Sequence, residues 1–142
     1  MLTIGTLARR TGTKVQTIRY YEQIGLMAEP ERTQGGQRRY DDAGLDRLAF
    51  IRHSRQLGFS LDAIRELLEL SDHPDKSCSE VDSIARRQLH QIEQRIARLD
   101  ALRTELGRMI SECSGGKLND CRVLEVLRNH AECLTDHARI GM

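Results

Sequence analysis

The sequence predicts a mainly α-helical protein made of an N-terminal head, one long helix, and a short loop and tail. Short segments with helical spacing of apolar residues fill residues 1–70. Residues 81–111 then contain no Pro and a single Gly, Gly107, which favours one uninterrupted helix. The 2 Phe and 3 Tyr all lie at or before Phe59, and Trp is absent, so the rest of the chain has only aliphatic side chains to pack.

Two short helices are predicted first, over residues 4–11 and 14–23. Gly12 ends the first and Gly25 ends the second, while Thr13 suits the turn between them. The apolar residues that recur at helical spacing are Ile4, Leu7 and Ala8, followed by Val15, Ile18 and Tyr21. Two short helices joined by a tight turn form the outline of a helix-turn-helix.

Residues 29–40 predict a β-hairpin, because Gly35-Gly36 between polar flanks is typical of a tight turn. Its arms carry Arg32, Arg38 and Arg39. A basic hairpin directly after a helix-turn-helix suits a wing that grips phosphates, and the alternative is a solvated loop with incidental arginines.

Two further helices complete the predicted head. One begins at Asp41 or Asp42 and runs to about Leu57, and the other covers residues 61–70 with Ser60 as its N-cap. We expect the inward side chains of the first to be Leu45, Leu48, Ala49 and Phe50, and those of the second to be Leu61, Ile64, Leu67 and Leu68.

The long helix carries a coiled-coil seam of about three heptads. Apolar residues follow alternating steps of three and four, with Arg103 as the one polar residue in the series: Leu89, Ile92, Ile96, Leu99, Leu106 and Ile110. The sequence predicts no second long helix that would cover this seam. An antiparallel homodimer is the simplest arrangement that buries it.

Three cysteines lie at the two ends of this helix. Cys113 and Cys121 flank a loop that Gly115-Gly116 can turn, whereas Cys78 is about 35 residues from Cys113, or about 50 Å along a helix. In an antiparallel dimer, Cys78 of the partner subunit would join Cys113 and Cys121. Three thiolates suit a soft ion such as Zn, Cd, Hg, Pb or Cu(I). Further candidate ligands are His130 and Cys133, with His90 and His137 as outer candidates.

Charge is distributed unevenly although the net charge is +1: residues 1–60 carry 10 Lys and Arg against 6 Asp and Glu, and residues 61–142 carry 12 against 15. A basic head on an acidic body fits a DNA-contacting protein. We expect a cytoplasmic chain that spans no membrane, because no apolar run is long enough and no signal peptide precedes the head. We expect no enzymatic activity, because the sequence contains no HExxH motif, no Ser/His/Asp ordering and no phosphate-binding loop.

The chain resembles the MerR family of transcription regulators over essentially its whole length. The residues that carry the resemblance are 4–8 (Ile-Gly-Thr-Leu-Ala), 17–22 (Thr-Ile-Arg-Tyr-Tyr-Glu), Gly25-Leu26, 32–40, 47–52 and 57–60 (Leu-Gly-Phe-Ser). The resemblance implies a winged helix-turn-helix dimer on palindromic promoter DNA. It also implies that metal binding bends and untwists the DNA, so that RNA polymerase can use the promoter and a repressor becomes an activator of metal-resistance or efflux genes.

The resemblance also implies roles for particular residues. Recognition-helix contacts to DNA would be Thr17, Arg19 and Tyr21, and wing contacts would be Arg32, Arg38 and Tyr40. At the start of the dimerisation helix, copper sensors of the family have Ser, while sensors of zinc, cadmium, lead or mercury have Cys. Cys78 therefore implies a divalent effector, and the alternatives are a Cu(I)- or Ag(I)-responsive copper-efflux regulator and a zinc-stabilised structural domain.

The predicted division of the chain has four parts: a winged helix-turn-helix domain with two supporting helices at 1–70, a linker at 71–80, a dimerisation helix at 81–112, and a metal-binding loop with a C-terminal tail at 113–142.

Overall fold

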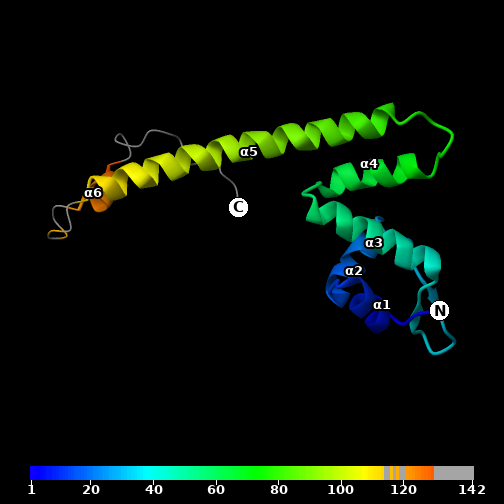
Figure 1. Cartoon of the computed structure of the whole chain (residues 1–142). Helices are drawn as coiled ribbons and strands as arrows, with labels where there is room; N and C mark the ends of the chain where they lie inside the picture. Colours follow the sequence, from blue (N-terminus) through cyan, green and yellow to red (C-terminus); the bar gives the residue numbers. More distant parts are fainter. Residues whose placement is uncertain (114–115, 117, 119–120, 130–142) are drawn as a thin grey trace. The chain divides into compact units, whose positions relative to one another are not determined.

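A computed structural model describes residues 1–113, 116, 118 and 121–129, and the chain divides into two compact units, Met1–Ile84 and Ala85–Met142 (Figure 1). The elements in chain order are α1 (Ile4–Thr11), α2 (Val15–Gln23), β1 (Glu31–Arg32), β2 (Arg38–Arg39), α3 (Asp42–Gln56), α4 (Leu61–Ser71), α5 (Ser79–Ser111) and α6 (Arg122–Arg128). The mainly helical fold with one long helix is confirmed. Among the described helices, none combines the length and apolar character that a membrane span needs.

The turn between α1 and α2 is set by a cap at each end of α1. The Thr3 side chain accepts a hydrogen bond from the Thr6 backbone N–H at 3.2 Å. At the other end Gly12 has φ +65°, and a Cβ there would lie 3.1 Å from the guanidinium carbon of Arg52. Because Arg52 also donates to the Gly12 carbonyl, glycine lets α3 approach this turn closely.

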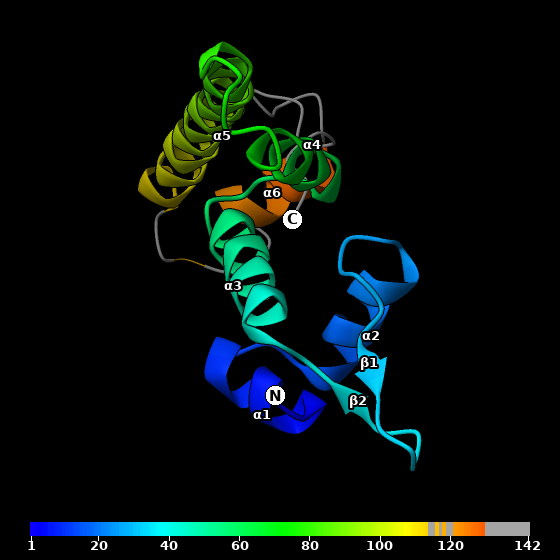
Figure 2. The ribbon, with the colours of Figure 1, turned by 90° about the vertical axis from the view of Figure 1, so that its right-hand side faces the viewer.

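The predicted hairpin is present and projects from the head beside α2 (Figure 2). β1 and β2 pair antiparallel, with Glu31 opposite Arg39 and Arg32 opposite Arg38. Gly36 has φ +81°, which supports the expected glycine turn. The N-terminal segment extends this small sheet, because Leu2 exchanges two backbone hydrogen bonds with Tyr40, at 2.7 and 2.8 Å.

The core of the first unit is formed by side chains from α1, α2, α3 and α4, together with the segments that join them. Its buried members are Leu7, Ile18, Tyr21, Leu26, Met27, Tyr40, Leu48, Ile51, Ile64 and Leu68. Guanidinium groups fix the end of α2, since Arg47 donates to the Leu26 carbonyl at 2.7 Å and Arg65 donates to the Ile24 carbonyl at 2.8 Å.

The expected inward face of α3 was wrong at one position. Phe50 is 37% exposed, whereas Ile51 is fully buried. A helix turns by about 100° per residue. Phe50 therefore lies about 200° from the buried Leu48, while Ile51 returns to the face that Leu48 occupies.

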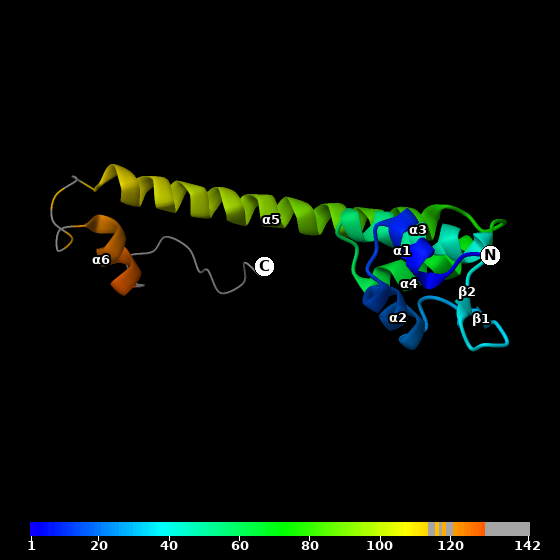
Figure 3. The ribbon, with the colours of Figure 1, turned by 90° about the horizontal axis from the view of Figure 1, so that it is seen from below.

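In the second unit α6 lies beside the C-terminal end of α5 (Figure 3). Met109 on α5 and Val126 on α6 are both buried there. The predicted seam of α5 is open in the single chain along its whole length, including beside Met109. Its exposed fractions lie between 37% and 66% for Leu89, Ile92, Ile96, Leu99, Leu106 and Ile110.

Candidate functional site

The two faces of α2 differ in exposure. Ile18 is fully buried and Tyr21 is 9% exposed, so both belong to the core. Arg19 and Tyr20 face solvent, and Thr17 is half-buried. Of the predicted recognition-helix contacts, Arg19 is therefore the cation that α2 presents at the surface. Its guanidinium can donate two parallel hydrogen bonds to a base edge or a phosphate.

The wing presents a second group of cations. Arg32 is exposed and donates to the Gly36 carbonyl at 2.9 Å, which braces the hairpin turn. Arg38 and Arg39 are half-buried. A cleft of about 380 Å³ lies between the start of α1, α2 and the wing, and it is lined by Thr3, Ile4, Arg19, Gly36, Gln37, Arg38 and Arg39. Three arginines around one cleft suit the phosphate backbone of DNA.

Glu22 joins the wing to α2. Arg38 donates through Nε to Glu22 Oε1 at 3.2 Å, and the Tyr40 hydroxyl donates to Glu22 Oε2. The Glu22 side chain is only 7% exposed and Tyr40 only 3%. Both oxygens of one buried carboxylate therefore hold the wing, and Tyr40 lies in the core instead of projecting toward solvent.

Sequence reasoning did not single out Glu22, because its partners lie 16 and 18 residues away. The available signal is that Glu22 is the one acidic residue of α2, and that the wing which follows carries arginines and a tyrosine able to bond it. Burial raises the pKa of Tyr40 most, and the hydrogen bond to Glu22 and the charge of Glu22 raise it further.

We expect Glu22→Ala to lower the free energy of unfolding by about 1–3 kcal/mol, because it leaves the buried Tyr40 hydroxyl without an acceptor. Urea denaturation at one fixed protein concentration measures this. The matched control is Glu22→Leu combined with Tyr40→Phe, which removes both members of the buried Glu22–Tyr40 hydrogen bond and should cost less than Glu22→Ala alone. An equal or larger loss in the double variant would contradict the assignment.

The two loop cysteines are brought together. Cys113 Sγ and Cys121 Sγ lie 3.9 Å apart, and both residues are half-buried. In a tetrahedral site with metal–sulfur bonds of about 2.3 Å, two sulfurs lie about 3.8 Å apart. The pair therefore fits two ligands of one soft metal ion with little movement.

The pKa of the Cys121 thiol is lowered. The backbone N–H of Leu124 contributes most, followed by the hydrogen bond with Cys113, the N–H of Val123 and the charge of Arg128, while partial burial acts in the opposite direction. A lowered pKa favours the thiolate, which is the form that binds metal.

The other predicted ligands are Cys78, His90, His130, Cys133 and His137. Cys78 is exposed immediately before α5 and belongs to the first unit, and its carbonyl accepts from the Asp82 N–H at 2.9 Å. His90 is exposed on α5. His130, Cys133 and His137 lie outside the described residues. Within the described part of the chain, no group of three or more His, Cys, Asp and Glu is placed to hold a metal ion.

Comparisons with known proteins cover nearly the whole chain. Residues 2–71 match the family described as "MerR HTH family regulatory protein", and residues 45–109 match "MerR, DNA binding". The chain is 42% identical over 134 residues to the HTH-type transcriptional regulator ZntR of Escherichia coli (strain K12), which covers 92% of this chain and 95% of that protein.

Two further relatives carry metals in their descriptions. The chain is 37% identical over 131 residues to a mercuric resistance operon regulatory protein of Shigella flexneri, covering 92% of this chain and 90% of that one. It is also similar to the crystal structure of the transcription regulator PbrR691 from Ralstonia metallidurans CH34 in complex with lead(II). That similarity has a TM-score of 0.78 and 38% identity, and it covers 89% of this chain and 99% of that one.

Proposed function

The chain belongs to the MerR family of helix-turn-helix regulators, and from this premise we propose that it is a metal-responsive DNA-binding transcription regulator. Its effector is a divalent soft metal ion, Zn, Cd, Pb or Hg. The apo-protein represses its promoter, and the metal-bound protein activates metal-resistance or efflux genes by distorting the promoter DNA for RNA polymerase. The observation that carries this proposal is the Cys113–Cys121 pair at 3.9 Å.

The metal site is completed in a homodimer. The pair supplies two thiolates, and Cys78 of the partner subunit supplies the third. Two thiolates neutralise a monovalent ion but leave a divalent ion under-neutralised, so a third favours a +2 charge. The lead(II) complex of PbrR691 and the mercuric resistance regulator support the divalent class over the copper alternative. His130 and Cys133 remain candidates for additional ligands.

The exposed apolar stripe of α5 supports the dimer. These side chains are at least 37% exposed in the single chain, and their steps of three and four suit an antiparallel coiled coil. A partner helix would cover them. Metal held between the ends of two such helices would couple metal binding to the position of the two DNA-binding heads.

The DNA contacts divide into two groups. Thr17, Arg19 and Arg32 touch the DNA directly, and Arg38 adds to the basic cleft at the wing. The buried Tyr21 and Tyr40 act from behind, by packing α2 in the core and by holding the wing through Glu22. The target is double-stranded palindromic promoter DNA, since a two-fold dimer presents two equivalent heads.

Transcription from the chain's own operator tests the proposal. At least one of zinc, cadmium, lead and mercury should induce transcription, and neither copper nor silver should. The Cys78→Ser variant should respond more weakly to the divalent ion, because each site then keeps only two thiolates. Induction by copper or silver alone would contradict the divalent assignment.

Metal removal separates this proposal from a zinc-stabilised structural domain. A sensor should stay folded and bind its operator after a chelator strips the metal, whereas a structural zinc domain should unfold. Circular dichroism and operator binding of the apo-protein measure the difference.

A further inference from the structure

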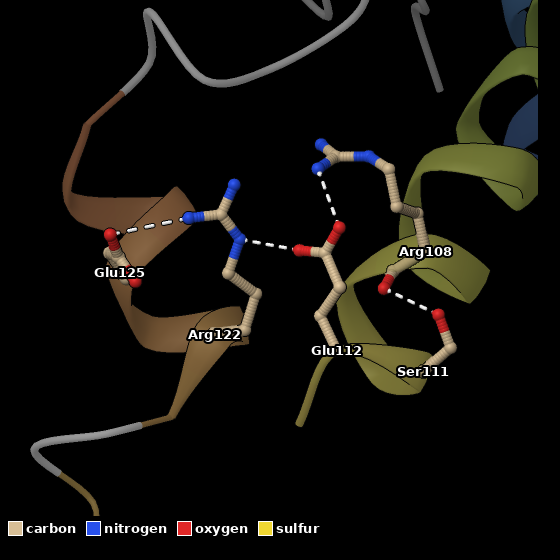
Figure 4. Close-up of polar contacts among 5 residues, drawn as sticks. All are labelled: Arg108, Ser111, Glu112, Arg122 and Glu125. Carbon is tan, nitrogen blue, oxygen red and sulfur yellow. Dashed lines mark hydrogen bonds and ion pairs between the residues drawn. The ribbon is translucent and has the colours of Figure 1, made fainter. Parts of the chain in front are cut away.

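The residues next to the two thiols form an ion-paired bridge across the loop (Figure 4). Glu112 directly precedes Cys113, and Arg122 directly follows Cys121. Arg122 Nε donates to Glu112 Oε2 at 2.6 Å. This contact joins the C-terminal end of α5 to the first residue of α6.

The other oxygen of Glu112 is also engaged. Arg108 Nη1, one turn earlier on α5, approaches Glu112 Oε1 at 3.5 Å. Arg122 in turn contacts Glu125 Oε1 through Nη1 at 3.2 Å within α6. Four alternating charges thus run from α5 to α6, and the side chains of Arg108 and Arg122 are both 26% exposed.

This pairing argues against Glu112 as a metal ligand. A carboxylate beside a thiol pair is a natural candidate for an additional ligand. Here both of its oxygens face guanidinium groups, and metal binding through either would first have to displace an arginine. The carboxylate is therefore placed to hold the two chain segments and not the ion.

We infer that the Glu112–Arg122 pair is a positioning bridge, which holds Cys113 and Cys121 at a metal-binding separation before the ion arrives. The inference rests on the proposed function, in which these thiols are ligands. Without the bridge, metal binding itself would have to close the loop between the two sulfurs. The entropy cost of closing the loop would then weaken metal binding.

Thiol oxidation in the apo-protein tests the bridge without any metal. Cys78→Ser and Cys133→Ser in the full chain leave only Cys113 and Cys121. Diamide then accepts two electrons and two protons from the two thiols, so that one disulfide forms and the azo bond becomes a hydrazine. The rate of disulfide formation, followed by mass spectrometry, reports how often the sulfurs meet.

We expect Glu112→Gln and Arg122→Gln each to slow this reaction by about threefold to fivefold, the range of a partly exposed ion pair. The double variant should be no slower than either single variant, because both remove the same contact. Asp100→Asn is the matched control: it breaks the Asp100–Arg103 pair of 2.8 Å on α5, far from the loop in sequence, and should leave the rate unchanged.

The signs distinguish positioning from simple charge effects. Removal of the Glu112 charge favours the reactive thiolates, whereas removal of the Arg122 charge disfavours them. A pure charge effect would therefore speed one variant and slow the other. Opposite signs, or an unchanged rate in both, would overturn the inference.

Zinc binding to the otherwise unmodified dimer, in competition with a chromophoric chelator, gives the second readout. Glu112→Gln should weaken zinc by a similar threefold to fivefold. If the unmodified protein bound none of zinc, cadmium, lead and mercury, the proposed function would be wrong, and the oxidation rates would still test the bridge. If Glu112→Gln bound zinc as tightly as the unmodified protein, the bridge would fail and the proposed function would stand.

Discussion

Cys113→Ser is expected to abolish metal-induced transcription while the apo-protein still binds its operator with unchanged affinity. The substitution removes one thiolate of the pair at 3.9 Å, so the proposed ion keeps two sulfur ligands. Removal of a group that merely orients a metal ligand costs about 10- to 100-fold in metal affinity. Removal of the ligand itself should cost at least that much.

Two measurements are needed for this variant. Reporter transcription over a metal titration gives the response, and operator binding in a chelator gives the state of the DNA-binding head. The control is Ser111→Ala, which removes a hydroxyl at the end of α5 that donates to the Arg108 carbonyl at 2.9 Å. Retained induction in Cys113→Ser would remove this thiol from the site.

Arg19→Ala should weaken operator binding by about 1–3 kcal/mol, which is about 5- to 150-fold in the dissociation constant. Arg19 is exposed on α2 and lines the cleft between α1 and the wing, so its truncation removes a contact without opening the core. Metal affinity should not change. Fluorescence anisotropy with operator DNA at several salt concentrations measures the loss.

The salt dependence shows what Arg19 touches. A phosphate contact predicts a weakening on all sequences and a salt slope reduced by about 1, while a base contact predicts relaxed specificity at one position. Arg95→Ala, which removes the same charge from an exposed position of α5, is the control. Equal operator affinity for Arg19→Ala and the unmodified protein would refute the recognition-helix assignment.

Local patterns were enough to predict most of the fold. Glycines at 12 and 25 end helices, and the Gly35-Gly36 turn forms, because these positions depend on backbone geometry within a few residues. The wrong position on α3 had a different origin. The sequence prediction places Phe50 inward, although the phase of the helix puts Ile51 on the face of Leu48.

The site was predicted less completely, because its polar contacts link distant residues. The sequence predicts Cys113 and Cys121 as ligands on either side of a Gly-rich loop, and their sulfurs lie 3.9 Å apart in the structure. No periodicity predicts that Glu22 accepts from Arg38 and Tyr40, or that Glu112 pairs with Arg122 ten residues later. Such pairs depend on how elements pack, and a charged residue in a polar sequence gives no hint of its partner.

The two faces of α2 have a consequence for how regulators of this kind diverge. Ile18 and Tyr21 are buried in the core, while Arg19 is exposed and Tyr20 is 48% exposed with its ring 6.2 Å from that of Tyr21. Under the proposed function, substitutions at these exposed positions would change operator preference at little cost in folding. Transplanting the exposed side chains of α2 together with those of the wing from a relative should move operator preference toward that relative's promoter, with the inducer unchanged.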